Sequence, residues 1–287
     1  MKFTAHNVAT AEGGRTIEGE PLLNEQGFCQ APLRTLNAIW SPEQRGNVRI
    51  VDLGCLEGGY AVEFARQGYQ SLGIEVRKAN VEKCEWLAEN LKLPNLKFAQ
   101  DDVRNAEKHG PFEAVFCSGL LYHLDEPTAF IKMLGKITST VLILQTHYAL
   151  GDLDDAEKGK QTLYDKVAPM LPERVRQKIA QKVLSPAEVN YKLSGLVKHE
   201  GKWGRWYGDY APSASKEQVE EDLWASYGNP RSFWLHKKEL LQVIREAGFD
   251  LIYEQYDFLD DISKNRYIEE YDRGLFVGLK TRALPVK

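Results

Sequence analysis

Long apolar runs are missing from the sequence. The longest, at 114–121 and 140–144, are far shorter than the roughly 20 residues that a membrane-spanning helix needs. The first 21 residues also lack an apolar stretch of the length that a secretory signal requires. These absences predict a soluble, cytoplasmic protein with no membrane partner.

Cysteine is scarce, and positive charge is not in surplus. The four cysteines form no CxxC pair, so we predict reduced thiols and no metal site or disulfide framework. The chain of 287 residues carries 37 Lys and Arg against 41 Asp and Glu, a net charge of −4. This balance disfavours a general nucleic-acid binder, because neutralising phosphates needs an excess of basic residues.

The sequence does contain an alternation of strand-like and helix-like segments. Five apolar, β-rich segments, each followed by a helical pattern or a turn, lie at 48–54, 70–76, 95–100, 112–119 and 139–146. Parallel strands need crossover helices, and those helices cover both faces of a sheet. Two further segments, 249–258 and 273–280, are joined without a crossover and favour a terminal antiparallel pair. We therefore predict an α/β fold with a doubly wound, mostly parallel seven-stranded sheet.

The alternation stops after the fifth strand, and a gap of about eighty residues must have structure of its own. We divide the chain into an N-terminal helical or cap segment (1–45), a sheet domain (46–150 and 235–287) and an insert (151–234). The insert is expected to be helical and aromatic, and to form a lid over the substrate or an oligomer contact. A helix near 32–40 is expected either across the sheet edge or over the ligand crevice.

The turn after the first strand, DLGCLEGG at 52–59, lies where doubly wound sheets bind ligands. Gly54 and Gly58 permit backbone torsions and a close ligand approach that a Cβ would block. A dinucleotide site would need glycine in place of Leu56, and Asp52 would disfavour a diphosphate nearby. S-adenosylmethionine carries an ammonium and a sulfonium, so the charge of Asp52 favours that cofactor over a nicotinamide dinucleotide.

Four segments in order, VDLGCLEGG, GIEV, QDDVRN and FCSGLLYHLDEP, resemble motifs of the class I S-adenosylmethionine-dependent methyltransferase family. The resemblance covers roughly 45–150 and 235–282, and it implies a Rossmann-like fold. Leu56 departs from the family's usual glycine. The implied cofactor-binding residues are Asp52 and Gly54 around the methionine moiety, Glu75 at the ribose hydroxyls, Asp102 and Val103 at the adenine, and Cys117 and Ser118 near the sulfonium. Cys55 and Gly58 of the same turn are also expected to bind the cofactor. Glu75 also has an independent basis, since a carboxylate some twenty residues past such a turn suits a ribose.

Methyl transfer from a sulfonium is an in-line displacement, so the enzyme must align a nucleophile and remove any proton that it carries. Tyr122 and His123 follow the fourth strand, and His147 follows the fifth, which places all three at the cleft. Imidazole exchanges protons near neutral pH. His123 is therefore the leading candidate for a general base and His147 the second, and a structural histidine bonded to backbone is the alternative for each.

The insert is basic and aromatic. Residues 158–202 hold ten Lys or Arg against four Asp or Glu, which fits either an anionic acceptor or a solvated helical face. The aromatic residues fit a lid that dries the site, the insert's own core or a dimer contact. They are Trp203, Trp206, Tyr207, Tyr210, Trp224, Tyr227, Phe233 and Trp234.

Together these features predict an S-adenosylmethionine-dependent methyltransferase that acts on a small anionic or aromatic molecule, preferentially at oxygen, as a monomer or homodimer. The Asp/Asn-Pro-Pro-aromatic motif of nucleic-acid amino methyltransferases is absent, which disfavours methylation of an adenine or cytosine amino group, and RNA is not the expected partner. Three alternatives remain: a nicotinamide-dependent oxidoreductase, a cofactor-binding protein without turnover, and a tRNA wobble-uridine methyltransferase, which the run at 121–124 also resembles.

Overall fold

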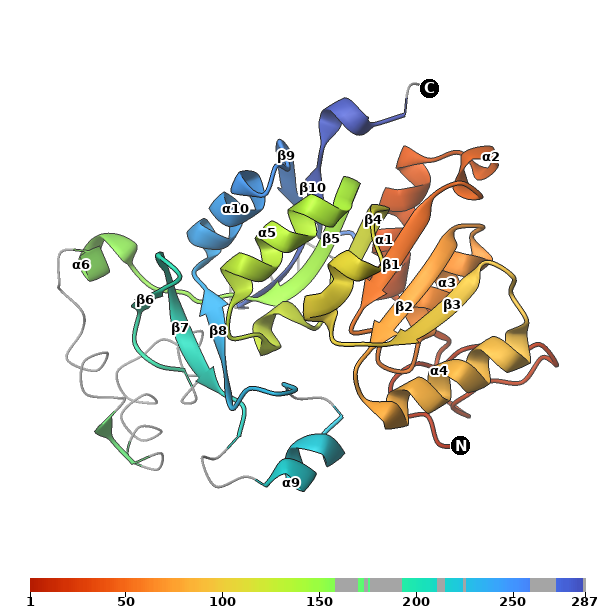
Figure 1. The fold of residues 1–287 in the computed structure, drawn as a ribbon, viewed down its shortest axis with the longest axis horizontal. Coiled ribbons are helices and arrows are strands. Elements are labelled where there is room, and N and C mark those ends of the chain that lie inside the picture. Colours follow the sequence, from red (N-terminus) through yellow and green to blue (C-terminus); the bar gives the residue numbers. More distant parts are fainter. Residues whose placement is uncertain are drawn as a thin grey trace.

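The computed structural model describes residues 1–157, 170–172, 175, 193–210, 215–223, 226–258 and 272–285. A seven-stranded sheet at its centre has the order β3-β2-β1-β4-β5-β10-β9 (Figure 1). The parallel strands are β1 (Arg49–Leu53), β2 (Gln70–Glu75), β3 (Leu96–Gln100), β4 (Phe112–Ser118) and β5 (Thr138–His147). β10 (Arg273–Leu279) is antiparallel to both β5 and β9 (Leu251–Glu254). The predicted fold, with its terminal antiparallel pair, is confirmed.

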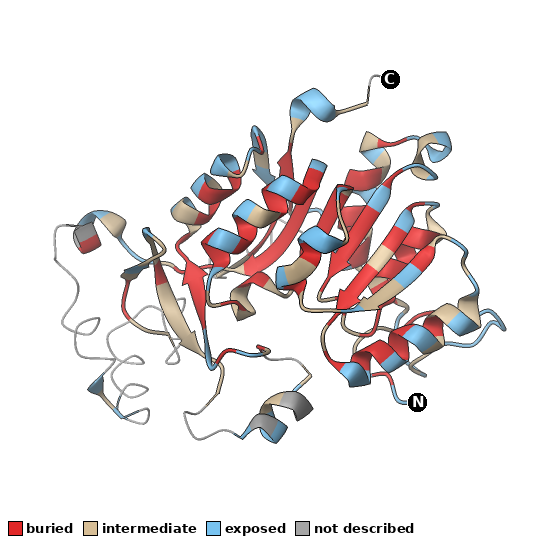
Figure 2. Ribbon diagram, in the orientation of Figure 1, coloured by how far each residue is buried: buried red, intermediate tan, exposed pale blue. Residues whose placement is uncertain are grey.

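Helices cover both faces of the sheet, and its central strands β1, β4, β5 and β10 are buried almost throughout (Figure 2). Successive strand residues point to opposite faces, so Ile50 packs with α1 (Gly27–Ile39) and α3 (Gly59–Arg66). Val51 packs on the other side with α5 (Pro127–Ile137) and α10 (Lys237–Glu246). Residues of α4 (Lys78–Leu91) pack against α3. The remaining short elements are η1 (Leu23–Glu25), α2 (Pro42–Arg45), η2 (Val103–Lys108), η3 (Leu121–His123), α6 (Leu153–Glu157), α9 (Lys216–Glu221) and η7 (Thr281–Ala283).

The N-terminal segment contacts both the sheet and the ligand crevice. Leu33 and Leu36 of α1 are buried on the sheet face, and His6, Gln26 and Phe28 line the cavity described below. Among the described residues, no helix has the length and apolar character that crossing a bilayer requires.

The described part of the insert is built on a second, three-stranded antiparallel sheet of β6 (Val197–His199), β7 (Lys202–Gly208) and β8 (Arg231–Leu235). We expected a helical and aromatic insert. Its described part contains the helices α6 and α9, and it also contains this sheet, which we did not predict: β-favouring aromatic residues in KWGRWYG and RSFWL pair as neighbouring strands. This small sheet is attached to the loop after β4: the indole Nε1 of Trp234 donates to the carbonyl of Tyr122 at 2.9 Å, and the backbone N–H of Phe233 donates to the carbonyl of Leu124. The insert therefore holds η3 in place.

Candidate functional site

A cavity of about 450 Å³ lies at the carboxyl ends of the parallel strands, where a doubly wound topology forms its ligand crevice. Three predicted site residues, Gly58, Cys117 and His147, are not among those that line it. The predicted residues in its wall are Asp52, Gly54, Cys55, Glu75, Asp102, Val103, Ser118, Tyr122 and His123.

Asp52 presents an unsatisfied carboxyl to the cavity. The side chain is 2% exposed, and its buried Oδ2 has no hydrogen-bond partner among the described residues. Burial raises the pKa of Asp52 to about 8; a backbone hydrogen bond from Ala61 opposes the rise, and the charge of Glu75 adds to it. A buried carboxyl with one oxygen left unsatisfied fits a cationic ligand group, which would satisfy that oxygen, and it disfavours a diphosphate.

The ligand-free protein should lose stability with rising pH because of Asp52. Its carboxyl keeps the proton up to about pH 8 in the native state but has an ordinary pKa of 3.8, so the native state binds more protons between these values and the free energy of unfolding falls as pH rises. Asp52→Asn removes this titration. The melting temperature of the variant relative to wild type should therefore increase from pH 5 to pH 8. Titrations that the two proteins share cancel in this difference in melting temperature. A difference that stays constant from pH 5 to pH 8 would therefore contradict the raised pKa of Asp52.

Leu56 adopts the backbone conformation that a glycine would take in this turn. Its φ is +51°, in the left-handed region that non-glycine residues rarely occupy. The turn thus keeps the path expected of the family motif. Gly58 has a packing role: its φ is +82°, and a Cβ there would lie 2.7 Å from the ring of Phe98.

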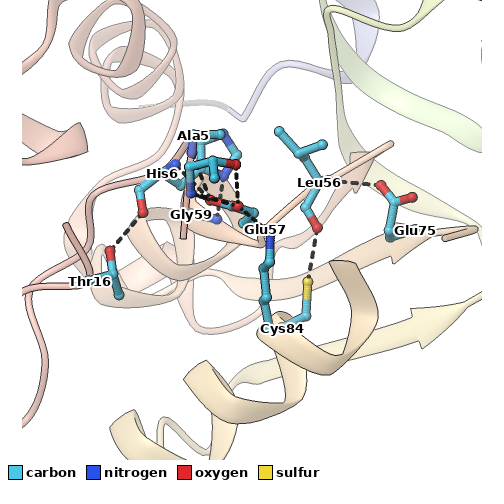
Figure 3. Close-up of polar contacts among 10 residues, drawn as sticks. Ala5, His6, Thr16, Leu56, Glu57, Gly59, Glu75 and Cys84 are labelled. Carbon is cyan, nitrogen blue, oxygen red and sulfur yellow. Dashed lines mark hydrogen bonds and ion pairs between the residues drawn. The ribbon is translucent and has the colours of Figure 1, made fainter. Parts of the chain in front are cut away.

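Glu75 ends β2 and is 5% exposed. Its Oε2 accepts the backbone N–H of Leu56 at 3.0 Å (Figure 3), and its Oε1 accepts that of Arg77 at 2.8 Å. Burial raises the pKa of Glu75, and these hydrogen bonds oppose the rise. Each carboxylate oxygen retains a second lone pair. Glu75 is therefore held in place and can still accept the hydroxyls of a diol.

The chain's N-terminal residues bind the same turn through Glu57, which the sequence did not single out (Figure 3). Glu57 accepts the N–H groups of Thr4 (2.9 Å), Ala5 (2.9 Å) and His6 (3.0 Å) and pairs with Lys83 at 2.6 Å. Burial alone would raise the pKa of Glu57, but the bonds from Lys83 and these N–H groups outweigh it and lower the pKa.

His6 closes the beginning of α3. Its Nδ1 accepts the N–H of Gly59, the first residue of α3, at 3.0 Å, and burial lowers the pKa of His6 to about 4. The imidazole is thus neutral, as an acceptor must be. Because dinucleotides place their diphosphate at this helix terminus, His6 obstructs that mode of binding.

His123 is paired with a buried acid that sequence reasoning missed. Its Nδ1 lies 3.2 Å from Oδ1 of Asp209, whose side chain is 2% exposed, and Oδ2 of Asp209 accepts the hydroxyl of Ser232 at 2.8 Å. A carboxylate accepts rather than donates, so the contact puts the ring hydrogen on Nδ1. His123 lines the cavity, and its Nε2 has no hydrogen-bond partner among the described residues. Asp209 lies 86 positions away in the sequence, and no local signal connects the two.

Tyr122 and His147 adjoin this pair. Burial raises the pKa of Tyr122, so its phenol stays protonated at neutral pH. His147 lies behind it: the two rings meet edge to face at 4.7 Å, His147 stacks on Trp234 at 4.7 Å, and its Nδ1 contacts Asp272 at 2.9 Å. The structure places His147 against the insert, outside the cavity lining.

Two further polar residues of the cavity wall, Gln145 and Arg273, carried no sequence motif. Oε1 of Gln145 accepts hydrogen bonds from the hydroxyl of Ser118 and from Nη2 of Arg273, both at 2.8 Å. Gln145 thereby joins the ends of β4 and β10 across β5. Cys117, which precedes Ser118, is fully buried, because alternate residues of a strand face opposite ways.

Among the described aromatic residues of the insert, Tyr227 lines the cavity. Tyr207 instead stacks on Trp234, and Trp206 packs against Phe233, so these form the core between the two sheets. Trp224 and the basic residues of 158–192 lie outside the described residues. Of the predicted basic cluster, Lys198 lies over the ring of Trp203, and Lys202 pairs with Glu239 and Glu246.

Comparison with known proteins gives one consistent result. A family model described as a methyltransferase domain matches residues 23–254. A ubiquinone biosynthesis O-methyltransferase of Acinetobacter baylyi is 28% identical over 109 residues, 35% of this chain and 46% of that protein. A protein of the same name from Xanthomonas oryzae pv. oryzae is 27% identical over 115 residues, 38% of this chain and 48% of that protein. The chain spans about half the length of these curated relatives.

Among solved structures, the chain resembles the N-terminal domain of EvdMO1, crystallised in the presence of SAH and D-fucose. The TM-score is 0.59 at 23% sequence identity, over 93% of this chain and 88% of that one. A second structure of that domain, with SAH bound, gives a TM-score of 0.58. At this identity the likeness shows a shared fold.

Proposed function

The chain belongs to the S-adenosylmethionine-dependent methyltransferase family, and from this premise we propose that it methylates an oxygen atom of a small molecule, with His123 as general base. When bound, S-adenosylmethionine supplies an electrophilic methyl group. Asp52 and Glu75 would hold it, the first by its unsatisfied carboxyl beside a cationic group and the second by accepting the ribose hydroxyls. The family and the closed N-terminus of α3 disfavour the nicotinamide alternative.

The His123–Asp209 pair in the cavity wall is the observation that supports oxygen as the methylated atom. A hydroxyl must lose its proton as it is methylated, whereas a thioether or tertiary amine need not. Nε2 of His123 can take that proton, and Asp209 stabilises the imidazolium that results. The name of the relatives, O-methyltransferase, agrees with this assignment. His147, which lies outside the cavity lining, is the weaker candidate for the base.

Tyr122 has a different role in this proposal. Its phenol remains protonated and lines the cavity beside His123, so it donates a hydrogen bond and orients the acceptor. Tyr227 and Leu223 of the insert also line the cavity. We therefore regard the insert as a lid that helps to exclude water from the site.

Calorimetry and a labelled-methyl assay test the function together. We expect the protein to bind S-adenosylhomocysteine at micromolar concentration and not to bind NADH. We also expect it to transfer labelled methyl from S-adenosylmethionine to a component of a metabolite extract.

Glu75→Gln should weaken the binding of S-adenosylhomocysteine by about 1–3 kcal/mol, or roughly 5- to 150-fold. The carbon-13 shift of the transferred methyl should be that of a methyl ether or ester. A methyl on nitrogen, carbon or sulfur would refute O-methylation, and binding without transfer to any extract would indicate a non-catalytic binder.

A further inference from the structure

We propose that Arg273 binds an anionic group, a carboxylate or phosphate, on the methyl acceptor. This inference rests on the proposed function and adds the acceptor's chemical class to it. Arg273 is the first residue of β10, and it lines the cavity. Its guanidinium is a cation with five N–H donors. Only one hydrogen bond to a described residue uses them, from Nη2 to the neutral amide oxygen of Gln145.

Among the residues that the structure describes, the remaining donors of Arg273 have no hydrogen-bond partner. Its Nε is buried without a hydrogen bond, and no Asp or Glu of the described residues forms an ion pair with it. The adjacent Asp272 contacts His147 instead. A partly buried cation left in this condition is costly. A carboxylate or phosphate would satisfy it through two parallel N–H···O bonds, the geometry that a guanidinium prefers.

The position of Arg273 along the sheet indicates the acceptor rather than the methyl donor. Residues assigned to the donor lie on one half of the sheet edge, from Asp102 after β3 through Glu75 on β2 to Asp52 on β1. β10 is the third strand beyond β1 in the opposite direction. Because neighbouring strands lie about 4.8 Å apart, β10 is roughly 14 Å from β1. Arg273 is therefore on the acceptor half of the cavity.

Arg273 is also close to the proposed base. Its Cζ lies 5.8 Å from the ring centre of Tyr122, and that ring lies 4.2 Å from the ring of His123. The guanidinium and the imidazole are thus at most about 10 Å apart, the limit that these two distances set. One small molecule can reach both. The geometry describes a hydroxy acid or hydroxy phosphate of about one ring in size, with its hydroxyl at His123 and its anion at Arg273.

Two probes of equal shape test the inference without requiring methyl transfer. The protein saturated with S-adenosylhomocysteine is titrated calorimetrically with 3-hydroxybenzoate and with 3-hydroxybenzamide at constant chloride concentration. We expect wild type to bind the carboxylate at least tenfold more tightly than the amide, and Arg273→Gln to abolish this preference. Arg273→Lys, which keeps the charge but loses the paired donors, should retain part of it. Gln145→Glu places a carboxylate beside Arg273 and should abolish the preference with the arginine still present.

Three results would overturn the inference. The first is that wild type binds the two probes with equal affinity or binds neither. The second is that Arg273→Gln still binds the carboxylate more tightly than the amide. The third is a tenfold loss of S-adenosylhomocysteine affinity in that variant, which would assign Arg273 to the donor's own carboxylate. We expect that affinity to stay within twofold. The proposed function fails separately, through the absence of methyl transfer by wild type, so the two failures are distinguishable.

Discussion

Replacing His123 with alanine should lower the rate of methyl transfer by roughly 10²- to 10⁴-fold, the contribution of a positioned general base. The acceptor's hydroxyl must lose its proton to a group at the cavity wall, and alanine offers no lone pair there. The affinity for S-adenosylhomocysteine should stay within twofold, because His123 lies with Tyr122 and Asp209 on the acceptor side. Turnover at saturating donor, measured with labelled methyl, separates the two effects. Wild-type turnover in the variant would leave His123 as a packing residue.

Asp209 should act through His123 as a positioning residue. Asp209→Asn keeps the size of the side chain, but its amide cannot stabilise an imidazolium, and it can turn the ring to the wrong tautomer. We expect a fall in turnover of at least tenfold and a displaced acidic limb of the pH–rate profile, which a merely structural role would not produce. His109 provides a matched control, since it forms a comparable 2.9 Å contact with Asp101 away from the cavity lining. His109→Ala should leave turnover within twofold of wild type. A larger loss of turnover in His147→Ala than in His123→Ala would make His147 the general base instead of His123.

The main sheet could be predicted because each of its signals is local. Strands such as 48–54 are short apolar runs bounded by turns and helices, and parallel pairing follows from the helices between them. The insert gave no such signal. β7 and β8 pair Trp206 with Phe233 across a stretch of 26 intervening residues, and an aromatic run does not show which segment it pairs with. The aromatic residues were recognised, but the sheet that they form was not.

The same distinction separates the predicted from the missed site residues. Asp52 and Glu75 lie at strand ends whose position at the crevice follows from the topology alone. Asp209 reaches His123, and Arg273 reaches the cavity, only because the insert and the last strand return to this end of the sheet, which depends on packing between distant segments. A motif also does not show whether a given residue faces the cavity or the core. Gly58 and Cys117 belong to the right segments but face Phe98 and the core.

The contact between the N-terminal residues and the turn at Glu57 could not be predicted from any motif. Disrupting this contact should lower the free energy of unfolding substantially. Glu57 is 1% exposed, and it joins residues 4–6 to Lys83 of α4. Glu57→Gln leaves the ammonium of Lys83, whose side chain is 10% exposed, without its counter-charge. Breaking one partner of a buried pair costs about 3–5 kcal/mol. Chemical denaturation should show a loss of that size.

Two further variants separate the buried pair from a general effect of charge removal. Glu82→Gln is the matched control, because Glu82 pairs with Lys78 at 3.9 Å on the exposed face of the same helix, and such pairs contribute about 0.3–0.5 kcal/mol. Glu57→Gln combined with Lys83→Met removes both buried charges and should recover much of the lost stability. Since His6 lines the cavity and binds Gly59, Glu57→Gln should also increase hydrogen exchange at residues 4–6 and weaken the binding of S-adenosylhomocysteine. Stability within 0.5 kcal/mol of wild type, with the N-terminal amides still protected, would show that the segment is held by its apolar contacts alone.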